Sequence, residues 1–292
     1  MTGPVDSIPA QNILGEGVSW HDETQSLWWT DIHGRRLFRY DFATRKTETF
    51  ATPERLTSFG FTHKPDTLIA ALETGIAFYE PATQKTSWLH RPHLETRDIR
   101  FNDGRVDRQG RFWTGTMIEG PDAAPSSAAL YSLDHTRSLR AHADGIAISN
   151  GICWSPDSTR MYFADSVKQT IWVYDFDTGT GVIANRRVFA QTPEGAYPDG
   201  ANVDSEGYLW SAHWGAGKVV RYAPDGTIER TLTVPAEQPT CVAFGGPKLD
   251  LLFVTSAREG LSKDTLASQP GAGDVFIYKA PVPGIADGRY TS

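Results

Sequence analysis

The sequence predicts an all-β protein, a six-bladed β-propeller with four-stranded blades and a ring closed by the N-terminal strand. Three observations predict it. Apolar residues recur with a period of two in short runs separated by Gly, Pro, Asp and Asn, which is typical of strands. A strand–turn–strand pattern repeats six times at a spacing of roughly 40–50 residues, as in propeller blades. The last copy is short of one strand, and the segment before the first copy has no blade of its own.

Each repeat begins with a small or apolar strand that is followed by a turn rich in Asp, Gly, Pro or Lys. A more apolar second strand comes next, and a third strand ends in an aromatic-rich run such as LFRYD, IWVYD or VFIYK. We find no convincing amphipathic helix, because the best stretch, Leu261–Ser268, is short. The six first strands carry the runs Val18–Trp20, Phe59–Phe61, Gly104–Val106, Ile152–Trp154, Ala201–Val203 and Val242–Phe244.

The ring needs a closing strand that the last repeat does not contain. After Val275–Lys279 only APVPGIADGRYTS remains, which is poor strand material. We infer that Ile8–Leu14 supplies the outer strand of the sixth blade, because an open ring would leave an unpaired sheet edge. The alternative is a pair of stacked sheets, but a sandwich does not need six matched repeats. We therefore expect residues 1–292 to form a single propeller domain.

Composition excludes several classes of partner. The chain has 28 basic and 35 acidic residues, a net charge of −7, and no basic run, so nucleic acid and anionic membranes are poor partners. No apolar stretch approaches the length of a membrane span, and the N-terminus lacks the pattern of a signal peptide. Cys153 and Cys241 are too few for a disulfide framework or a thiolate metal site. We expect a cytoplasmic protein that is a monomer or a weak dimer.

Polar residues occupy the same register position in every repeat. In a propeller the innermost strand of each blade lines the central channel, and its first residues surround one mouth. Equal register in sequence therefore means a ring in space. The residues four positions before the end of each first strand are Glu16, Thr57, Asn102, Asn150, Asp199 and Thr240.

Four members of this ring are carboxylates or carboxamides, and none of the six is hydrophobic. Such a donor set, without His or Cys, is a hard oxygen site for one divalent metal ion such as Ca²⁺, Zn²⁺, Mn²⁺ or Fe²⁺. Asn-Gly and Asp-Gly are also ordinary turn dipeptides. However, turn residues have no reason to gather at one end of one strand, so the matched register favours a metal site.

Two connections between second and third strands are unusually long, and both return to this mouth. They are 117–129 and 256–274, and they bring Glu119 and Arg258 to the site face. Arg100, two residues before the ring position of its strand, also lies there. Its fork of donors suits a polyhydroxy ligand.

The histidines and tryptophans of this face are weaker candidates. His33 and His213 fall on connections at the same mouth, but a lone His is more often a surface or packing residue than a ligand. Trp214 is a candidate for an apolar wall of the pocket. No P-loop, GxGxxG, GxSxG or HExxH motif occurs, so nucleotide-phosphate, serine-esterase and zincin interpretations have no support.

A series of motifs resembles the senescence-marker-protein-30/gluconolactonase/LRE-like family from about Leu14 to Tyr278. In order, these motifs are LGEG at 14–17, RFNDG at 100–104, VDRQGR at 106–111, GTM at 115–117, SNG at 149–151, WSPD at 154–157, PDG at 198–200, DSEGYLW at 204–210, FGG at 244–246 and AREGLS at 257–262. The resemblance implies a six-bladed propeller and a metal-dependent lactonase.

The resemblance also implies roles for the ring residues. It implies that Glu16, Asn150 and Asp199 bind the metal ion. It implies that Arg100, Asn102 and Glu119 bind the substrate, with Asn102 also close to the metal.

The sequence thus predicts a metal-dependent hydrolase that opens a sugar-acid lactone to the aldonic acid, as in gluconolactone, arabinonolactone or xylonolactone hydrolysis. We predict that Asp199 doubles as the general base. Two alternatives remain open: a non-enzymatic metal-binding or interaction propeller, and a metal-dependent esterase or organophosphate hydrolase.

Overall fold

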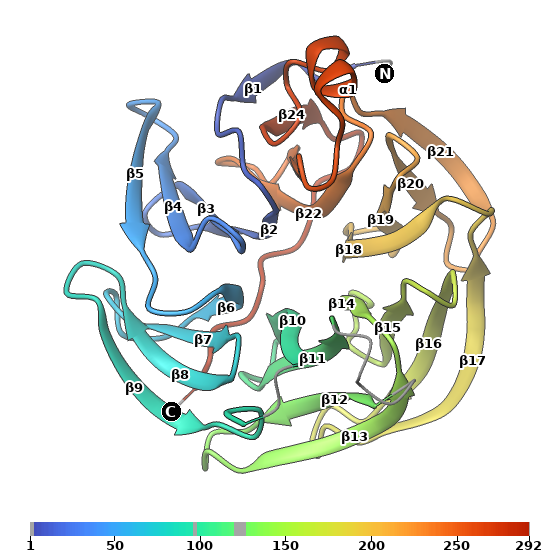
Figure 1. Ribbon diagram of the computed structural model, residues 1–292. Coiled ribbons are helices and arrows are strands. Elements are labelled where there is room, and N and C mark those ends of the chain that lie inside the picture. The colour runs from blue at the N-terminus through green and yellow to red at the C-terminus, as the bar shows by residue number, and fades with distance from the viewer. Residues whose placement is uncertain (1–2, 96–97, 120–126, 292) are drawn as a thin grey trace.

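The computed structural model describes residues 3–95, 98–119 and 127–291. Six antiparallel four-stranded sheets stand around a central channel, so the predicted propeller is confirmed (Figure 1). From the channel outward, the first three blades are β2 (Gly15–His21), β3 (Ser26–Asp31), β4 (Arg36–Asp41), β5 (Lys46–Ala51); β6 (Leu56–Phe61), β7 (Leu68–Leu72), β8 (Gly75–Glu80), β9 (Lys85–His90); and β10 (Ile99–Val106), β11 (Phe112–Ile118), β12 (Ala128–Leu133), β13 (Leu139–Ile146).

The last three blades follow the same order. They are β14 (Ser149–Trp154), β15 (Arg160–Asp165), β16 (Thr170–Phe176), β17 (Ile183–Gln191); β18 (Tyr197–Val203), β19 (Leu209–Trp214), β20 (Lys218–Tyr222), β21 (Ile228–Thr233); and β22 (Pro239–Gly245), β23 (Leu251–Ser256), β24 (Val275–Lys279), β1 (Asp6–Ile8). The six predicted first strands are all innermost strands.

The hydrophobic core lies between neighbouring blades. Trp29, Trp113 and Trp210 are fully buried there. Trp20 of the first blade stacks on Phe253 of the sixth, with ring centroids 5.8 Å apart, so the same packing continues across the closure. Because each interblade layer joins two sheets, the innermost strands are held in fixed register around the channel.

The N-terminal strand closes the ring, as predicted, but its bounds differ from the prediction. β1 pairs antiparallel with β24, with Ile8 opposite Val275. Of the expected segment 8–14, only Ile8 belongs to this strand. Pro9 cannot donate a backbone hydrogen bond to a ladder, and the N–H groups of Ala10 and Gln11 donate instead to Oδ1 of Asp274.

The C-terminal segment 280–291 adds a feature that the sequence did not reveal. It crosses the channel mouth at which the innermost strands end (Figure 1). The N–H of Gly284 donates to the carbonyl of Leu249, and the N–H of Tyr290 donates to that of Phe61. The segment therefore ties several blades together and covers the mouth opposite the predicted ring.

The structure describes one of the two long connections completely and the other only in part. The one after β23 contains α1 (Lys263–Ser268), a single short helix. Of the predicted 117–129 connection, residues 120–126 lie outside the described residues. Within the described ranges, no helix is long and apolar enough to cross a membrane.

Candidate active site

Every innermost strand is irregular at the predicted ring position. The pairing of each with the next strand shifts register there, for example between Glu16 and Ser19 and between Asn150 and Cys153. The glycines that follow, Gly17 and Gly151, have φ of 58° and 64°, a left-handed conformation that other residues adopt only with strain. Such bulges re-aim side chains, here toward the channel mouth.

Four of the six ring residues line one pocket, and the two threonines do not. Thr57 donates its hydroxyl to the carbonyl of Ala71, and Thr240 donates to the hydroxyl of Thr255, 2.8 Å away. The hydroxyl of Thr240 also contacts the carbonyl of Gly15 in the first blade, so both threonine side chains bond to the strands around them. The pocket has a volume of about 400 Å³. It is lined by Leu14, Glu16, Arg100, Asn102, Met117, Ile148, Asn150, Ser166, Val167, Tyr197, Asp199, Trp214 and Glu259.

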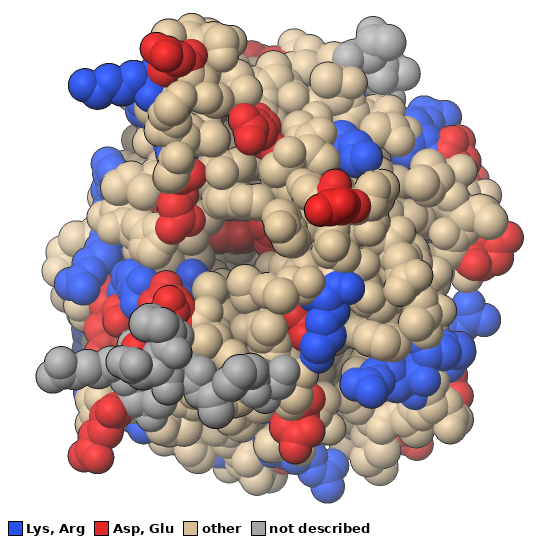
Figure 2. Space-filling view, turned by 45° about the vertical axis from the view of Figure 1, so that its right-hand side comes forward, with Lys and Arg blue, Asp and Glu red and all other residues tan. Residues whose placement is uncertain are grey.

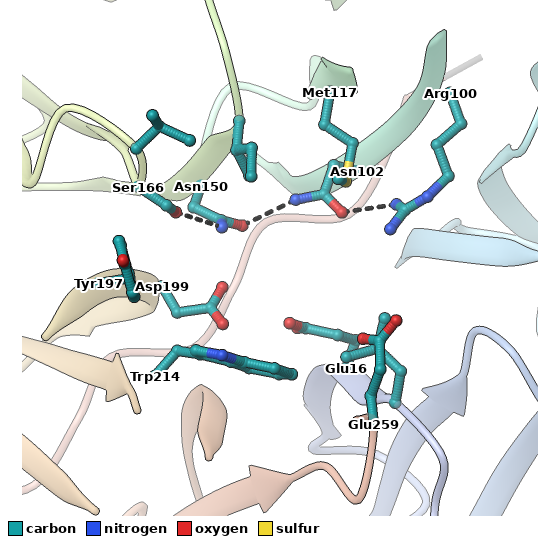
Figure 3. Close-up of a pocket in the computed structure, with 13 residues that line it drawn as sticks. Glu16, Arg100, Asn102, Met117, Asn150, Ser166, Tyr197, Asp199, Trp214 and Glu259 are labelled. Atoms are coloured by element: carbon teal, nitrogen blue, oxygen red, sulfur yellow. Dashed lines mark hydrogen bonds between the residues drawn. The ribbon is translucent and has the colours of Figure 1, made fainter. Parts of the chain in front are cut away.

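The pocket opens at the face shown in Figure 2, where acidic side chains are visible inside the central hollow. Its lining is of two kinds. Polar groups come mainly from the ring, whereas residues such as Trp214, Ile148 and Val167 supply apolar surface. In the view of Figure 3 the indole of Trp214 is seen edge-on, below the carboxylate of Asp199.

A continuous chain of hydrogen bonds orders the carboxamides (Figure 3). Nη1 of Arg100 donates to Oδ1 of Asn102 at 2.7 Å, and Nδ2 of Asn102 donates to Oδ1 of Asn150 at 3.0 Å. Nδ2 of Asn150 then donates to the hydroxyl of Ser166, which donates to the carbonyl of Pro198. The orientations of both side-chain amides are thereby fixed. Oδ1 of Asn102 and Oδ1 of Asn150 each keep a second lone pair that a ligand could use.

Two carboxylates, Glu16 and Asp199, face this chain from the other side of the pocket (Figure 3). Burial, and then the nearby Asp103, raise the pKa of Glu16 to about 8. Burial, and then Glu16, raise the pKa of Asp199 well above its ordinary value. Oδ1 of Asp199 is buried and has no hydrogen-bond partner among the described residues. Two buried like charges with an unpartnered oxygen are the environment that a cation relieves.

The donor set for such a cation includes a carboxamide. Across the described ranges, no three His, Cys, Asp or Glu side chains converge as possible ligands. An ion between Glu16 and Asp199 would therefore need a carboxamide oxygen as a third side-chain ligand, and Asn102 and Asn150 both line the pocket. All-oxygen donation with two negative charges suits a hard or borderline divalent cation.

The predicted substrate residues occupy two layers. Arg100 and Asn102 line the pocket. Glu119 is absent from the lining and instead accepts from Nε of Arg100 at 2.6 Å and from both terminal nitrogens of Arg55. These arginines lower the pKa of Glu119 against the opposing effect of its burial. Glu119 thus does not line the pocket itself, and its link to the site is its hydrogen bond to Arg100.

The other candidates at this face differ in whether they reach the pocket. Arg258 lies outside the pocket lining and donates to Oε1 of Gln11, while its neighbour Glu259 lines the pocket. Nε2 of His33 lies 2.9 Å from Oε1 of Glu259. His213 is buried, and burial lowers its pKa to about 3, so it is a neutral packing residue. Position on the loop does not tell from sequence alone which of the two neighbours, Arg258 or Glu259, faces the pocket.

Comparison with known proteins identifies the family. The family model described as "SMP-30/Gluconolactonase/LRE-like region" matches residues 14–258. The chain belongs to this family.

Alignments with relatives extend over nearly the whole chain. This chain is 40% identical to L-arabinolactonase of Azospirillum brasilense over 96% of this chain and 93% of the relative. It is 36% identical to 6-deoxy-6-sulfogluconolactonase of Pseudomonas putida over 94% of both chains. The crystal structure of a calcium-binding protein, regucalcin, from Agrobacterium tumefaciens superposes with a TM-score of 0.93 at 29% identity, covering 99% of this chain and 98% of that one.

Proposed function

We propose that the protein is a metal-dependent hydrolase that opens the ring of a sugar-acid lactone to give the aldonic acid. The observation that carries the proposal is the pair of buried carboxylates, Glu16 and Asp199, with Oδ1 of Asp199 left without a protein partner. The relatives named L-arabinolactonase and 6-deoxy-6-sulfogluconolactonase support the reaction class, since lactonases are carboxylic-ester hydrolases.

Glu16, Asn150 and Asp199 would hold the divalent ion. When bound, the ion supplies Lewis acidity toward the lactone carbonyl and lowers the pKa of bound water. It would also lower the pKa values of Glu16 and Asp199, because a nearby positive charge favours the ionised carboxylates. Asp199 would then be ionised at neutral pH and able to accept a proton.

The chain's own residues perform the remaining tasks. Asp199 acts as the general base and accepts a proton from the attacking water, whose oxygen forms a bond to the carbonyl carbon. The ring C–O bond breaks, and the ring oxygen takes up the proton that Asp199 accepted and becomes a hydroxyl. Asn102 and Arg100 orient the substrate, and Glu119 holds the guanidinium of Arg100 in place through its 2.6 Å hydrogen bond.

The two kinds of pocket wall favour a sugar acid. A sugar ring presents hydroxyls in its plane and C–H bonds on its faces. Trp214 and Tyr197 offer aromatic surface to the C–H bonds, whereas Arg100, Asn102 and Glu259 offer polar groups to the hydroxyls. Buried polar groups without a partner cost about 1–3 kcal/mol each, so a plain alkyl lactone would bind less well.

A lactone panel assayed with and without metal tests the proposal. Gluconolactone, arabinonolactone, xylonolactone and an unsubstituted lactone of equal ring size are offered to chelated protein and to protein resupplied with Ca²⁺, Mn²⁺, Zn²⁺ or Fe²⁺. We expect chelation to abolish hydrolysis while the circular dichroism spectrum stays unchanged, because sheet pairing holds the blades. Full activity after chelation, or no lactone hydrolysis with any of these metals, would overturn the proposal.

A further inference from the structure

Glu259 places a negative charge on the pocket wall that the proposed reaction does not use. Glu259 is among the residues that line the pocket (Figure 3). Two contacts fix it: its backbone N–H donates to the carbonyl of Ile13 at 3.0 Å, and its Oε1 lies 2.9 Å from Nε2 of His33. The hydrogen bond to His33 is the main cause that lowers the pKa of Glu259, so the carboxylate is ionised at neutral pH.

The positive charge in the pocket is already balanced. Arg100 is the one Lys or Arg among the described lining residues. Its guanidinium bonds to Glu119, which also pairs with Arg55, and Arg55 pairs in turn with Glu73. Two arginines and two glutamates give this cluster a net charge of zero. It therefore offers a substrate hydrogen-bond donors rather than a surplus cation.

We infer that the pocket selects lactones with uncharged hydroxyl-bearing side chains, rejects lactones that end in a carboxylate or sulfonate, and owes this selectivity to Glu259. The inference rests on the proposed function, in which Glu16 and Asp199 balance the charge of the divalent ion. An alcohol donates a hydrogen bond to the Glu259 carboxylate, whereas an anionic group at the same place is repelled. The Pseudomonas putida relative is named for a sulfonated sugar lactone, and a lactone of that charge is one that this pocket would reject.

The test compares two lactones of one sugar, a neutral aldonolactone and the lactone whose terminal CH₂OH is replaced by a carboxylate or CH₂SO₃⁻. The quantity measured is the ratio of kcat/KM for the anionic to the neutral lactone. Glu259→Gln keeps the size of the side chain and removes its charge. Glu237→Gln is the matched control, because Glu237 is exposed, lies two residues before the start of β22 and is absent from the pocket lining.

We expect the wild-type ratio to be well below one, and Glu259→Gln to raise it on the order of tenfold, the effect of one like charge about 4 Å away at a dielectric close to that of water. Glu237→Gln should leave the ratio unchanged. Added salt should also raise the wild-type ratio, since exposed charges are screened. A wild-type ratio near one, a salt-independent ratio, or equal responses of the two variants would overturn the inference. Absence of hydrolysis of both lactones would instead overturn the proposed function.

Discussion

Nδ2 of Asn102, on the third blade, donates a 3.0 Å hydrogen bond to Oδ1 of Asn150, on the fourth. A second bond from the same nitrogen reaches the carbonyl of Ser149 at 2.9 Å. One carboxamide thus fixes both the side chain of Asn150, the predicted metal ligand, and the carbonyl of the residue before it. Positioning of this kind normally sets the affinity of a metal site, because it orients the ligand before the ion arrives.

We therefore expect Asn102→Ala to weaken divalent-metal binding by roughly 10–100-fold, the usual cost of losing a partner that orients a ligand. Isothermal titration of chelated protein with Ca²⁺ or Mn²⁺ measures this. Asn185→Ala is the control, since Asn185 is exposed and bonds to Asp175 on an outer face. Unchanged metal affinity in Asn102→Ala would show that Asn150 does not depend on Asn102.

Arg100→Ala should erode the preference for a polyhydroxylated lactone over a plain one. The change removes a buried donor and leaves Oδ1 of Asn102 without its 2.7 Å partner. Losing hydrogen bonds worth about 1–3 kcal/mol lowers kcat/KM for the sugar lactone by roughly 10–100-fold. The plain lactone, which lacks hydroxyls, should lose less. Arg258→Ala is the matched control, because Arg258 bonds to Gln11 outside the pocket. Equal losses with both lactones in Arg100→Ala would contradict its role in substrate recognition.

The gain in stability from added metal should increase with pH. The pKa of Glu16 is about 8 in the folded protein and 4.5 in its ordinary state, so between these values the folded chain binds more protons than the unfolded chain. The free energy of unfolding of the chelated protein should therefore fall as pH rises through this window. A divalent ion removes that penalty. The rise in Tm on adding metal should be larger at pH 8 than at pH 5, and smaller in Glu16→Gln. A rise that does not depend on pH would contradict this assignment.

The C-terminal segment should contribute strongly to stability although it belongs to no blade. Tyr290 is fully buried, and its hydroxyl donates to the carbonyl of Asp134 at 2.7 Å. By comparison with other large buried aromatic residues, Tyr290→Ala should lower the free energy of unfolding by about 3–5 kcal/mol. Arg289→Ala should cost no more than about 1 kcal/mol, because its partners Asp22 and Glu23 are exposed. Urea denaturation measures both, and equal effects would mean that the segment is not tightly packed.

The ring register was predictable because a propeller repeats one strand six times around an axis. Counting back from each first strand therefore collected Glu16, Asn102, Asn150 and Asp199 at one mouth. Which ring members point into the pocket was not predictable, since bulges and local bonds such as that from Thr57 to Ala71 decide it. The sixfold repeat predicts neither the role of Glu259 nor that of the C-terminal segment. Both depend on contacts between residues far apart in the chain, which local patterns do not encode.

In the proposed mechanism Glu16 and Asp199 hold one divalent ion, and Asp199 also moves the proton. The most direct measurement is kcat for sugar-lactone hydrolysis by Asp199→Asn and Glu16→Gln across a metal titration. We expect excess metal to restore much of the activity of Glu16→Gln, whose defect is in affinity. Asp199→Asn should remain roughly 10²–10⁴-fold below wild type at saturating metal, the usual contribution of a general base. Recovery of Asp199→Asn to the same extent as Glu16→Gln would contradict the role of Asp199 as general base, because Asp199 would then be a ligand only.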